Sequence, residues 1–276
     1  LVWKQELPNK VLGYNEVQDF DFGAKALDGD DDVTQQANVH VAYAGVTTTG
    51  EAYLSSEAPR TPGTYTETAT VVGGNYLAKP ISRAFSIGRA QTNVTLEGDT
   101  FTYNGKPQGP TATVVNSVGD PIDDTVLAYL YSGVTAAGNA YLSTSAPTEA
   151  GQYVVSVTFV GDAQNGSSSN IATLTINKAS AAIVMNDDAA TYDGSTHGLS
   201  ATATIPGDNG STVDVTDKLT IRYGDKDDEP TNAGSYEVTA TFPGNDNVEP
   251  TRVKANLTIA PRPVTITPSA EKTSKV

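Results

Sequence analysis

The sequence of 276 residues lacks cysteine altogether and contains only two histidines, one tryptophan and one methionine. Without cysteine there is no disulfide framework, no thiolate metal site and no thiol catalysis. The two histidines, His40 and His197, stand in unrelated segments, and no serine lies in a Gly-x-Ser-x-Gly motif, which excludes nucleophilic and zinc catalysis. We therefore expect no enzyme, although a glycosidase built on paired carboxylates stays open because the chain has 32 acidic residues.

Positive charge and long apolar runs are also scarce. Lysine and arginine total 17 against 32 aspartate and glutamate residues, so the formal net charge is −15. Such a negative field repels phosphate backbones, and we expect no nucleic-acid binding. No stretch of about 18 apolar residues occurs, so the sequence predicts no membrane insertion. We expect a monomer that is stabilised by the burial of apolar side chains alone.

The chain does contain a repeated strand motif. Gly-x-Tyr occurs at residues 63–65, 151–153 and 234–236, with successive copies 88 and 83 residues apart. This spacing is the size of one small β domain rather than of a solenoid unit. Each copy is followed by a closing strand of alternating apolar and polar residues, at 85–87, 174–176 and 257–259. The sequence predicts three tandem domains, repeat 1 (residues 1–89), repeat 2 (90–178) and repeat 3 (179–261), with 262–276 beginning a fourth.

The segments between the repeats are short. Joint 1 (residues 88–90) and joint 2 (residues 177–179) are not Gly/Ser tethers, so we expect them to be semi-rigid. No segment shows a sustained helical period. The predicted fold is all-β, with tandem Ig-like β-sandwich domains arranged as an elongated rod. β-Grasp-like repeats are the alternative, but the sequence offers no helix for such a sheet to grasp.

Two strand patterns make more local predictions. Residues 126–131 are apolar on both faces, which predicts a central strand covered on both sides. Repeats 1 and 2 share a segment, residues 52–56 and 140–144, which repeat 3 replaces with the acidic residues 225–229. We therefore expect repeat 3 to have lost an edge strand.

The tyrosines of the repeated motif are candidates for a structural role. Tyr65, Tyr153 and Tyr236 each begin a predicted strand, where a tyrosine can bury its ring and return its hydroxyl to the backbone, as in the tyrosine corner of immunoglobulin-like sandwiches. The preceding glycine is expected to take a positive φ. The alternative is that these rings merely fill strand positions without a hydroxyl partner.

Several motifs together resemble a known family. They are the openings Tyr103-Asn104-Gly105 and Tyr192-Asp193-Gly194, the Ala-Gly-x-Tyr strands, residues 244–247, the closing Leu-Thr-Ile and the restart at residues 263–266. Over roughly residues 90–276 the chain resembles the MBG-type repeats of bacterial surface proteins, Ig-like modules of cell-wall or secreted adhesins, some grouped with mucus-binding proteins. The resemblance implies an extracellular, cell-surface location and a stalk or adhesion role, but no particular ligand.

Two functions therefore compete. The repeats are either a spacer that projects a binding region from the cell wall, or themselves bind a host glycan, a mucin or an extracellular-matrix protein. A sugar site typically uses exposed aromatic rings beside acid or carboxamide groups. The candidates for such contacts are Trp3, Tyr53 and Tyr141, although the two tyrosines can equally belong to an edge strand of the core.

Calcium is the only cofactor that the sequence suggests. Asp225, Asp227 and Asp228 offer several hard oxygen ligands near a turn, yet no stretch matches the twelve-residue calcium loop. The other interpretation is a set of solvated surface acids. A Lys–Asn isopeptide crosslink is a further alternative, for which Lys178 and Lys254 are the candidate lysines.

Overall fold

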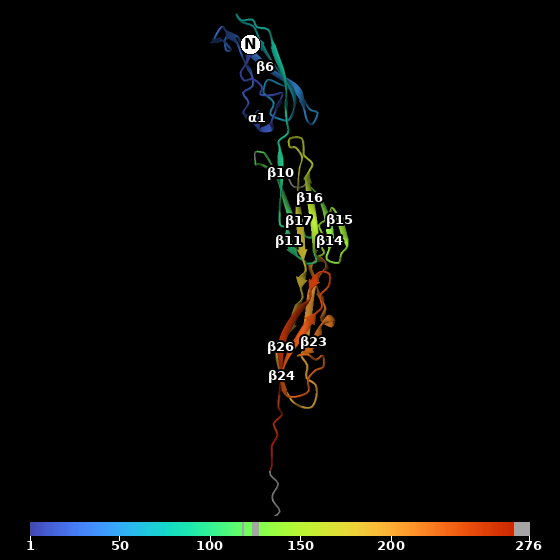
Figure 1. The fold of residues 1–276 in the computed structure, drawn as a ribbon. Helices are drawn as coiled ribbons and strands as arrows, with labels where there is room; N and C mark the ends of the chain where they lie inside the picture. The colour runs from blue at the N-terminus through green and yellow to red at the C-terminus, as the bar shows by residue number, and fades with distance from the viewer. Residues whose placement is uncertain (118, 123–126, 268–276) are drawn as a thin grey trace, which may run out of the picture. The chain divides into compact units, whose positions relative to one another are not determined.

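The computed structural model describes residues 1–117, 119–122 and 127–267, and nearly all of its regular structure is β-strand (Figure 1). The sheets are those of tandem Ig-like β-sandwich domains, which confirms the predicted fold class. The described residues divide into two compact units. Unit 1 comprises residues 1–98, 110–130 and 155–172, and unit 2 comprises residues 99–109, 131–154 and those from 173 onward. Residues 268–276 of the predicted fourth repeat lie outside the described residues.

Repeat 2 contains a five-stranded and a three-stranded sheet. The first has the order β11 (Thr100–Thr102), β17 (Ser168–Asn177), β16 (Gly151–Phe159), β14 (Leu127–Thr135), β15 (Ala140–Ser143), and the second β10 (Thr92–Glu97), β12 (Thr111–Asn116), β13 (Pro121–Ile122). β10 pairs antiparallel with β12, whereas β11 pairs parallel with β17. Between β10 and β11, Gly98 has a φ of 88°, which glycine adopts without steric cost. This glycine lets the first strand cross from one sheet to the other.

Repeat 3 has the same plan with one strand fewer. Its larger sheet runs β20 (Asp188–Thr191), β26 (Thr251–Ala260), β24 (Gly234–Phe242), β23 (Thr220–Tyr223), and its smaller sheet runs β19 (Ala182–Met185), β21 (Ala201–Gly207), β22 (Ser211–Asp214). After β23 the chain turns at Gly224, whose φ is 62°, and Tyr223 bridges to Lys226. The prediction that repeat 3 lacks an edge strand is thus confirmed.

Repeat 1 keeps the five-stranded sheet and covers it differently. The sheet runs β2 (Val11–Leu12), β9 (Ile81–Ile87), β8 (Gly63–Val71), β6 (Val39–Thr47), β7 (Ala52–Ser55). In place of a three-stranded sheet, the short helix α1 (Tyr14–Asp19) and two small ribbons, β1 (Val2–Trp3) with β3 (Ala24–Lys25) and β4 (Leu27–Asp28) with β5 (Asp31–Asp32), accompany it. Val17, Phe20 and Phe22 pack into one core with Tyr43, Tyr65 and Phe85.

Strand alternation decides which side chains enter the cores. In β16 the buried residues are Tyr153, Val155, Val157 and Phe159, every second position of the strand. The opposite face of the five-stranded sheet is open to solvent, since Leu130 of β14 is 47% exposed. The predicted cover on both faces of residues 126–131 is therefore wrong for the described residues 127–131, while Val126 lies outside them.

The outer strands β7 and β15 form open edges of their sheets. Each carries a leucine at the same place, with Leu54 84% exposed and Leu142 75% exposed. An edge strand presents backbone N–H and C=O groups that have no ladder partner.

Within the described residues, no helix is long and apolar enough to cross a membrane.

Candidate functional site

The three motif tyrosines make the same hydrogen bond in each repeat. Each hydroxyl donates to the backbone oxygen of the residue four positions earlier. Tyr65 donates to Thr61 O at 2.9 Å, Tyr153 to Glu149 O at 2.8 Å and Tyr236 to Asn232 O at 2.9 Å. This is the contact that a tyrosine corner requires. Burial, together with the nearby Glu149 carboxylate, raises the pKa of Tyr153 to about 12. How much each hydroxyl stabilises its repeat stays a prediction.

The glycine before each tyrosine serves a purpose other than the expected one. None of Gly63, Gly151 and Gly234 has a positive φ, so that expectation is wrong. A Cβ on Gly63 would lie 2.5 Å from the backbone oxygen of Val46 and 2.6 Å from the Tyr65 hydroxyl, and Gly151 is equally crowded. In repeats 1 and 2 the glycine is needed because the tyrosine ring and the backbone of the neighbouring strand leave no room for a Cβ, whereas the atom nearest to a Cβ on Gly234 would lie 3.3 Å away.

The tyrosines predicted to contact glycans are partly committed to the fold. Tyr53 and Tyr141 are half-buried, and their hydroxyls donate to the backbone oxygens of Glu57 (2.9 Å) and Ser145 (2.8 Å). Each ring stands edge-on against the corner tyrosine of its own repeat, with ring centroids 5.5 Å apart. Only part of each ring is therefore accessible to a ligand.

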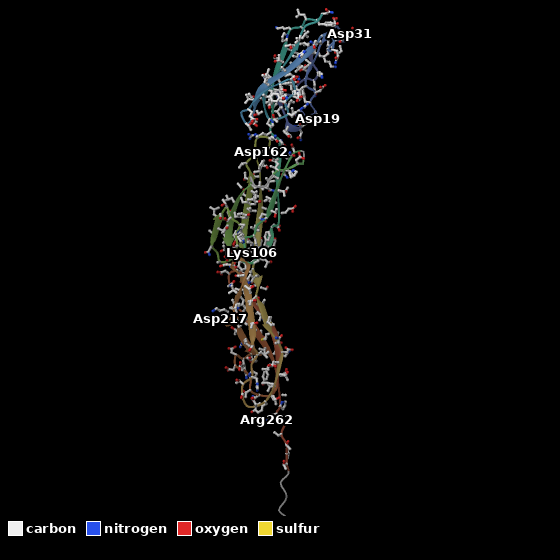
Figure 2. The ribbon with its side chains drawn as sticks, turned by 180° about the vertical axis from the view of Figure 1, so that it is seen from behind. Asp19, Asp31, Lys106, Asp162, Asp217 and Arg262 are labelled. Carbon is white, nitrogen blue, oxygen red and sulfur yellow. The ribbon has the colours of Figure 1, made fainter. Side chains whose placement is uncertain are left out.

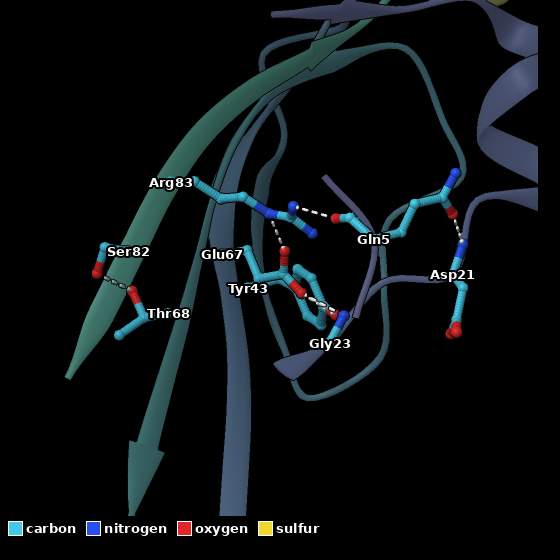
Figure 3. A network of polar contacts seen from close by, with 8 residues as sticks. All are labelled: Gln5, Asp21, Gly23, Tyr43, Glu67, Thr68, Ser82 and Arg83. Atoms are coloured by element: carbon cyan, nitrogen blue, oxygen red, sulfur yellow. Dashed lines mark hydrogen bonds and ion pairs between the residues drawn. The ribbon is translucent and has the colours of Figure 1, made fainter. Parts of the chain in front are cut away.

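Trp3, the third predicted contact, lies against Arg83, which belongs to a polar network in repeat 1 (Figure 3). The Arg83 guanidinium lies over the Trp3 ring, 4.2 Å from its centroid, and its Nε is 2.7 Å from Oε2 of the fully buried Glu67. Oε1 of Glu67 accepts hydrogen bonds from the Tyr43 hydroxyl (2.9 Å) and the Gly23 N–H (2.6 Å). Burial and the Glu67 charge raise the pKa of Tyr43, which stays protonated and donates.

Sequence analysis missed this network, although one signal was present. Glu67 occupies an inward position in the alternation of β8, where repeat 2 has Val155. A charged residue at such a position needs a buried partner. Arg83 supplies it from β9 and also donates from Nη1 to the backbone oxygen of Gln5 (2.7 Å).

The proposed calcium ligands do not converge. Arg222 holds Asp227 by an Nε–Oδ1 contact of 2.7 Å and donates to the backbone oxygen of Asp225. No group of three or more acidic or histidine side chains in the described part of the chain is placed to hold a metal ion, and Asp228 completes none. The ion pair with Arg222 thus occupies Oδ1 of Asp227, one of the three predicted ligands.

The two candidate crosslinking lysines have other partners. Lys254 Nζ lies 2.8 Å from Oε1 of Glu237, and Lys178 Nζ donates to the backbone oxygen of Asn245 at 2.9 Å. Neither contact is with an asparagine side chain, as a Lys–Asn isopeptide would require.

Backbone hydrogen bonds hold both joints. In unit 1 the Ala90 N–H of joint 1 donates to Gln164 O, and Gly166 N–H donates back to Ala90 O, both at 2.8 Å. The Asp162 carboxylate shapes this loop, which follows β16 (Figure 2), by accepting from the N–H groups of Gln164 and Asn165 at 2.7 Å. In unit 2 the Ala179 N–H of joint 2 donates to Asn247 O at 2.9 Å.

Several hollows occur among the described residues. Over Gly45 in repeat 1 and Gly133 in repeat 2 lie matched depressions of about 440 and 370 Å³, formed largely by small and threonine side chains on the open sheet face. A third hollow, of about 330 Å³, lies in unit 1 and is bordered by Tyr53, Glu51 and Gln164. Of the three predicted glycan contacts, Tyr53 thus borders a cleft.

These sheets and corners define a protein built of tandem Ig-like repeats. Residues 92–180 and 181–262 match the family model described as the MBG domain, in two adjacent copies. Because the matches cover more than half of the chain, it belongs to the MBG domain family. No curated protein matches it.

Solved structures of tandem domains are similar only distantly. Immunoglobulin domains 1–5 of Sidekick-1 are 13% identical, with 83% of this chain and 53% of that chain covered and a TM-score of 0.28. Mouse cadherin-23 EC22–24 is 11% identical, with coverage of 87% and 90% and a TM-score of 0.24. Domains 1–6 of the surface layer protein SbsC are 13% identical, with coverage of 82% and 35% and a TM-score of 0.26. The chain spans about half the length of the Sidekick-1 fragment.

Proposed function

We propose that this chain is a non-enzymatic spacer segment of a bacterial cell-surface adhesin, which projects a binding region away from the cell wall. Its location in this proposal is extracellular. The observation that carries the proposal is the pair of directly adjacent MBG repeats, at whose boundary the Ala179 N–H of joint 2 is hydrogen-bonded to Asn247 O. A spacer needs domains that fold independently and joints that resist bending.

The contacts at joint 2 support resistance to bending. Ala150 N–H and the Glu149 carboxylate of repeat 2 bind the side chain of Asn247, whose own backbone oxygen accepts from Ala179. On a second path, Asn209 N–H donates to Gly105 O at 2.7 Å. A Cβ on Gly105, whose φ is 73°, would lie 1.7 Å from Gly207 O, so only glycine permits this approach.

Small-angle X-ray scattering on the whole chain tests the proposal. A single compact domain of this length has a radius of gyration of about 19 Å. Three domains in line reach on the order of 100 Å. We expect a radius of gyration well above the compact value and a rigid scattering profile, which becomes flexible when a Gly/Ser segment is inserted in joint 2. A compact particle, or a profile that the insertion does not change, contradicts the spacer role.

The alternative, that the repeats bind a host glycan, mucin or matrix protein, has one specific observation in its favour. The ring of Tyr53 borders a polar cleft, whereas Trp3 is stacked against Arg83. Binding there is compatible with a spacer role, because the cleft does not involve joint 2.

A further inference from the structure

The cleft beside Tyr53 lies in unit 1, between the turn that joins β6 to β7 and the loop that follows β16. Its walls are residues 47–49 and 51–53, the pair Thr61-Pro62, and the pair Ala163-Gln164. The Thr48 hydroxyl donates to Ala163 O at 2.7 Å and so ties two of these walls together. Its volume of about 330 Å³ falls within the range of about 300–1,000 Å³ that is typical of ligand sites.

The lining combines the groups that bind a hydroxylated ligand. Four threonines line the cleft: Thr47, Thr48, Thr49 and Thr61. Their hydroxyls bond within the chain, Thr47 with Thr49, Thr48 with Ala163 O and Thr61 with the Tyr65 hydroxyl, and so fix the shape of the walls. Glu51 is exposed and makes no ion pair among the described residues. The half-buried Tyr53 ring is held in place by its hydroxyl bond to Glu57 O. An aromatic face beside carboxylate, amide and hydroxyl groups suits a sugar ring, which has apolar C–H faces and polar edges.

At joint 2 the corresponding groups are hydrogen-bonded to one another, unlike those at joint 1. There Oδ1 of Asn247 accepts from Ala150 N–H at 2.9 Å, and its Nδ2 donates to the Glu149 carboxylate. The counterparts in unit 1 are Gln164, Pro62 and Thr61. Proline has no N–H to donate, and the Gln164 amide has no hydrogen-bond partner in the described part of the chain.

We propose that this cleft binds a neutral saccharide, with the Tyr53 ring under the sugar and the Glu51 carboxylate and Gln164 amide on its hydroxyls. The ligand is neutral because the cleft carries a free carboxylate on a chain of net charge −15, which repels anionic sugars. This binding activity goes beyond the spacer role and does not depend on it.

Amide NMR on the full chain tests the site directly. The probes are glucose, galactose, N-acetylglucosamine and N-acetylgalactosamine, with sialic acid as the anionic comparison. Each sugar is added up to a concentration about ten times a Kd of the order of 1 mM. We expect at least one neutral sugar to shift the amides of residues 47–53 and 161–166 in a saturable manner, and sialic acid to leave them unchanged.

Matched variants separate this cleft from adventitious binding. Glu51→Ala and Gln164→Ala each remove one hydrogen-bonding group from an exposed position, and we expect each to weaken binding about tenfold. Asn139→Ala alters the counterpart of Glu51 in repeat 2 and should leave the affinity unchanged. The double variant Pro62→Ala with Gln164→Asn copies the bonding of joint 2 into joint 1 and should close the cleft to sugar.

Three results overturn the proposal. One is that no neutral sugar of the panel shifts the cleft amides. Another is that sialic acid shifts them as strongly as the neutral sugars. The third is that binding survives both Glu51→Ala and Gln164→Ala while the variant spectra remain those of a folded chain. None of these results bears on the scattering experiment, so the spacer role is tested separately.

Discussion

Repeats 1 and 2 hold the same five-stranded sheet but cover it in different ways. Two residues after the corner tyrosine, repeat 1 has the buried Glu67 and repeat 2 has Val155, and Arg83 of repeat 1 corresponds to Ala172. In repeat 2 apolar side chains fill these places. In repeat 1 backbone groups of Gln5 and Gly23, which belong to the covering N-terminal segment, form hydrogen bonds with the buried charges. The difference shows that one sheet can be covered by a second sheet or by an irregular segment that polar contacts hold in place.

The largest effect that we predict comes from breaking this charge pair. Glu67→Ala or Arg83→Ala leaves the other charge buried without its partner, and we expect a loss of about 3–5 kcal/mol in the free energy of unfolding of repeat 1. Trp3 is the only tryptophan, so its fluorescence during denaturant titration reports on repeat 1.

The control replaces both charges by the residues of repeat 2. The double variant Glu67→Val with Arg83→Ala should lose less stability than either single change, because no unpaired charge remains. Lys254→Ala breaks the exposed pair with Glu237 in repeat 3 and should cost less than about 1 kcal/mol. Additive losses in the double variant would mean that the two residues do not act as a pair.

The second prediction compares glycines that differ in crowding. Gly63→Ala should destabilise repeat 1 by about 1–3 kcal/mol, because the added methyl must displace the Tyr65 ring or the strand beside it. Gly234→Ala should cost less, since the nearest atom to its Cβ would be the Tyr236 hydroxyl at 3.3 Å. Fluorescence of Trp3 measures the first change, and hydrogen exchange of β24 measures the second. Equal losses would contradict the crowding explanation.

The third prediction concerns the corner hydroxyls. Tyr153→Phe leaves the backbone oxygen of Glu149 without its donor, and we expect a loss of about 1 kcal/mol. Tyr236→Phe should lose less, because Tyr236 is only half-buried, whereas Tyr153 is 3% exposed. Hydrogen exchange of β16 and β24 reads out both variants in the whole chain. An unchanged exchange rate in β16 would leave Tyr153 as a ring that merely fills its strand position.

The smallest predicted effect is an alkaline loss of stability in repeat 2. The pKa of Tyr153 is raised to about 12, above its usual value of about 10, so the fold favours the protonated form. This contribution is full below about pH 10 and disappears as the pH rises through about 12. Solvent screening makes it small, because the hydroxyl is only partly buried. Exchange of β16 should become less pH-dependent in Tyr153→Phe, and an identical pH dependence would remove the explanation.

Much of the fold was predictable because it depends on local patterns. The alternation at Tyr153 and Leu174 predicted buried strand faces, and the acidic residues 225–229 predicted the missing edge of repeat 3. The positive φ expected before each corner tyrosine was wrong, because the sequence shows a glycine but not the ring that folds over it. The cover expected on residues 126–131 was wrong because an apolar pattern does not show whether a second layer is present.

The candidate site was less predictable because it depends on contacts between distant segments. Glu67 and Arg83 meet only after β8 and β9 pair, and their backbone partners come from an irregular segment with no periodic pattern. Tyr53 was a predicted ligand contact, but its neighbour Gln164 was not, since the two residues lie far apart in the sequence. Repeat 1 has Pro62 where repeat 2 has Ala150, so the Gln164 amide finds no N–H donor there. This difference is visible only in the hydrogen bonds at the joints.

The open edges of β7 and β15 make the negative net charge of the chain relevant to association between its molecules. Their exposed leucines and unpaired backbone groups are what two molecules need to stick together strand to strand. Many proteins guard such edges with lysine or proline, but the segments AYLS of these two strands contain neither. A net charge of −15 supplies a mutual repulsion that acts over about 8 Å in physiological salt. Crowded copies of this chain would thus be kept apart by their shared charge rather than by the design of each edge.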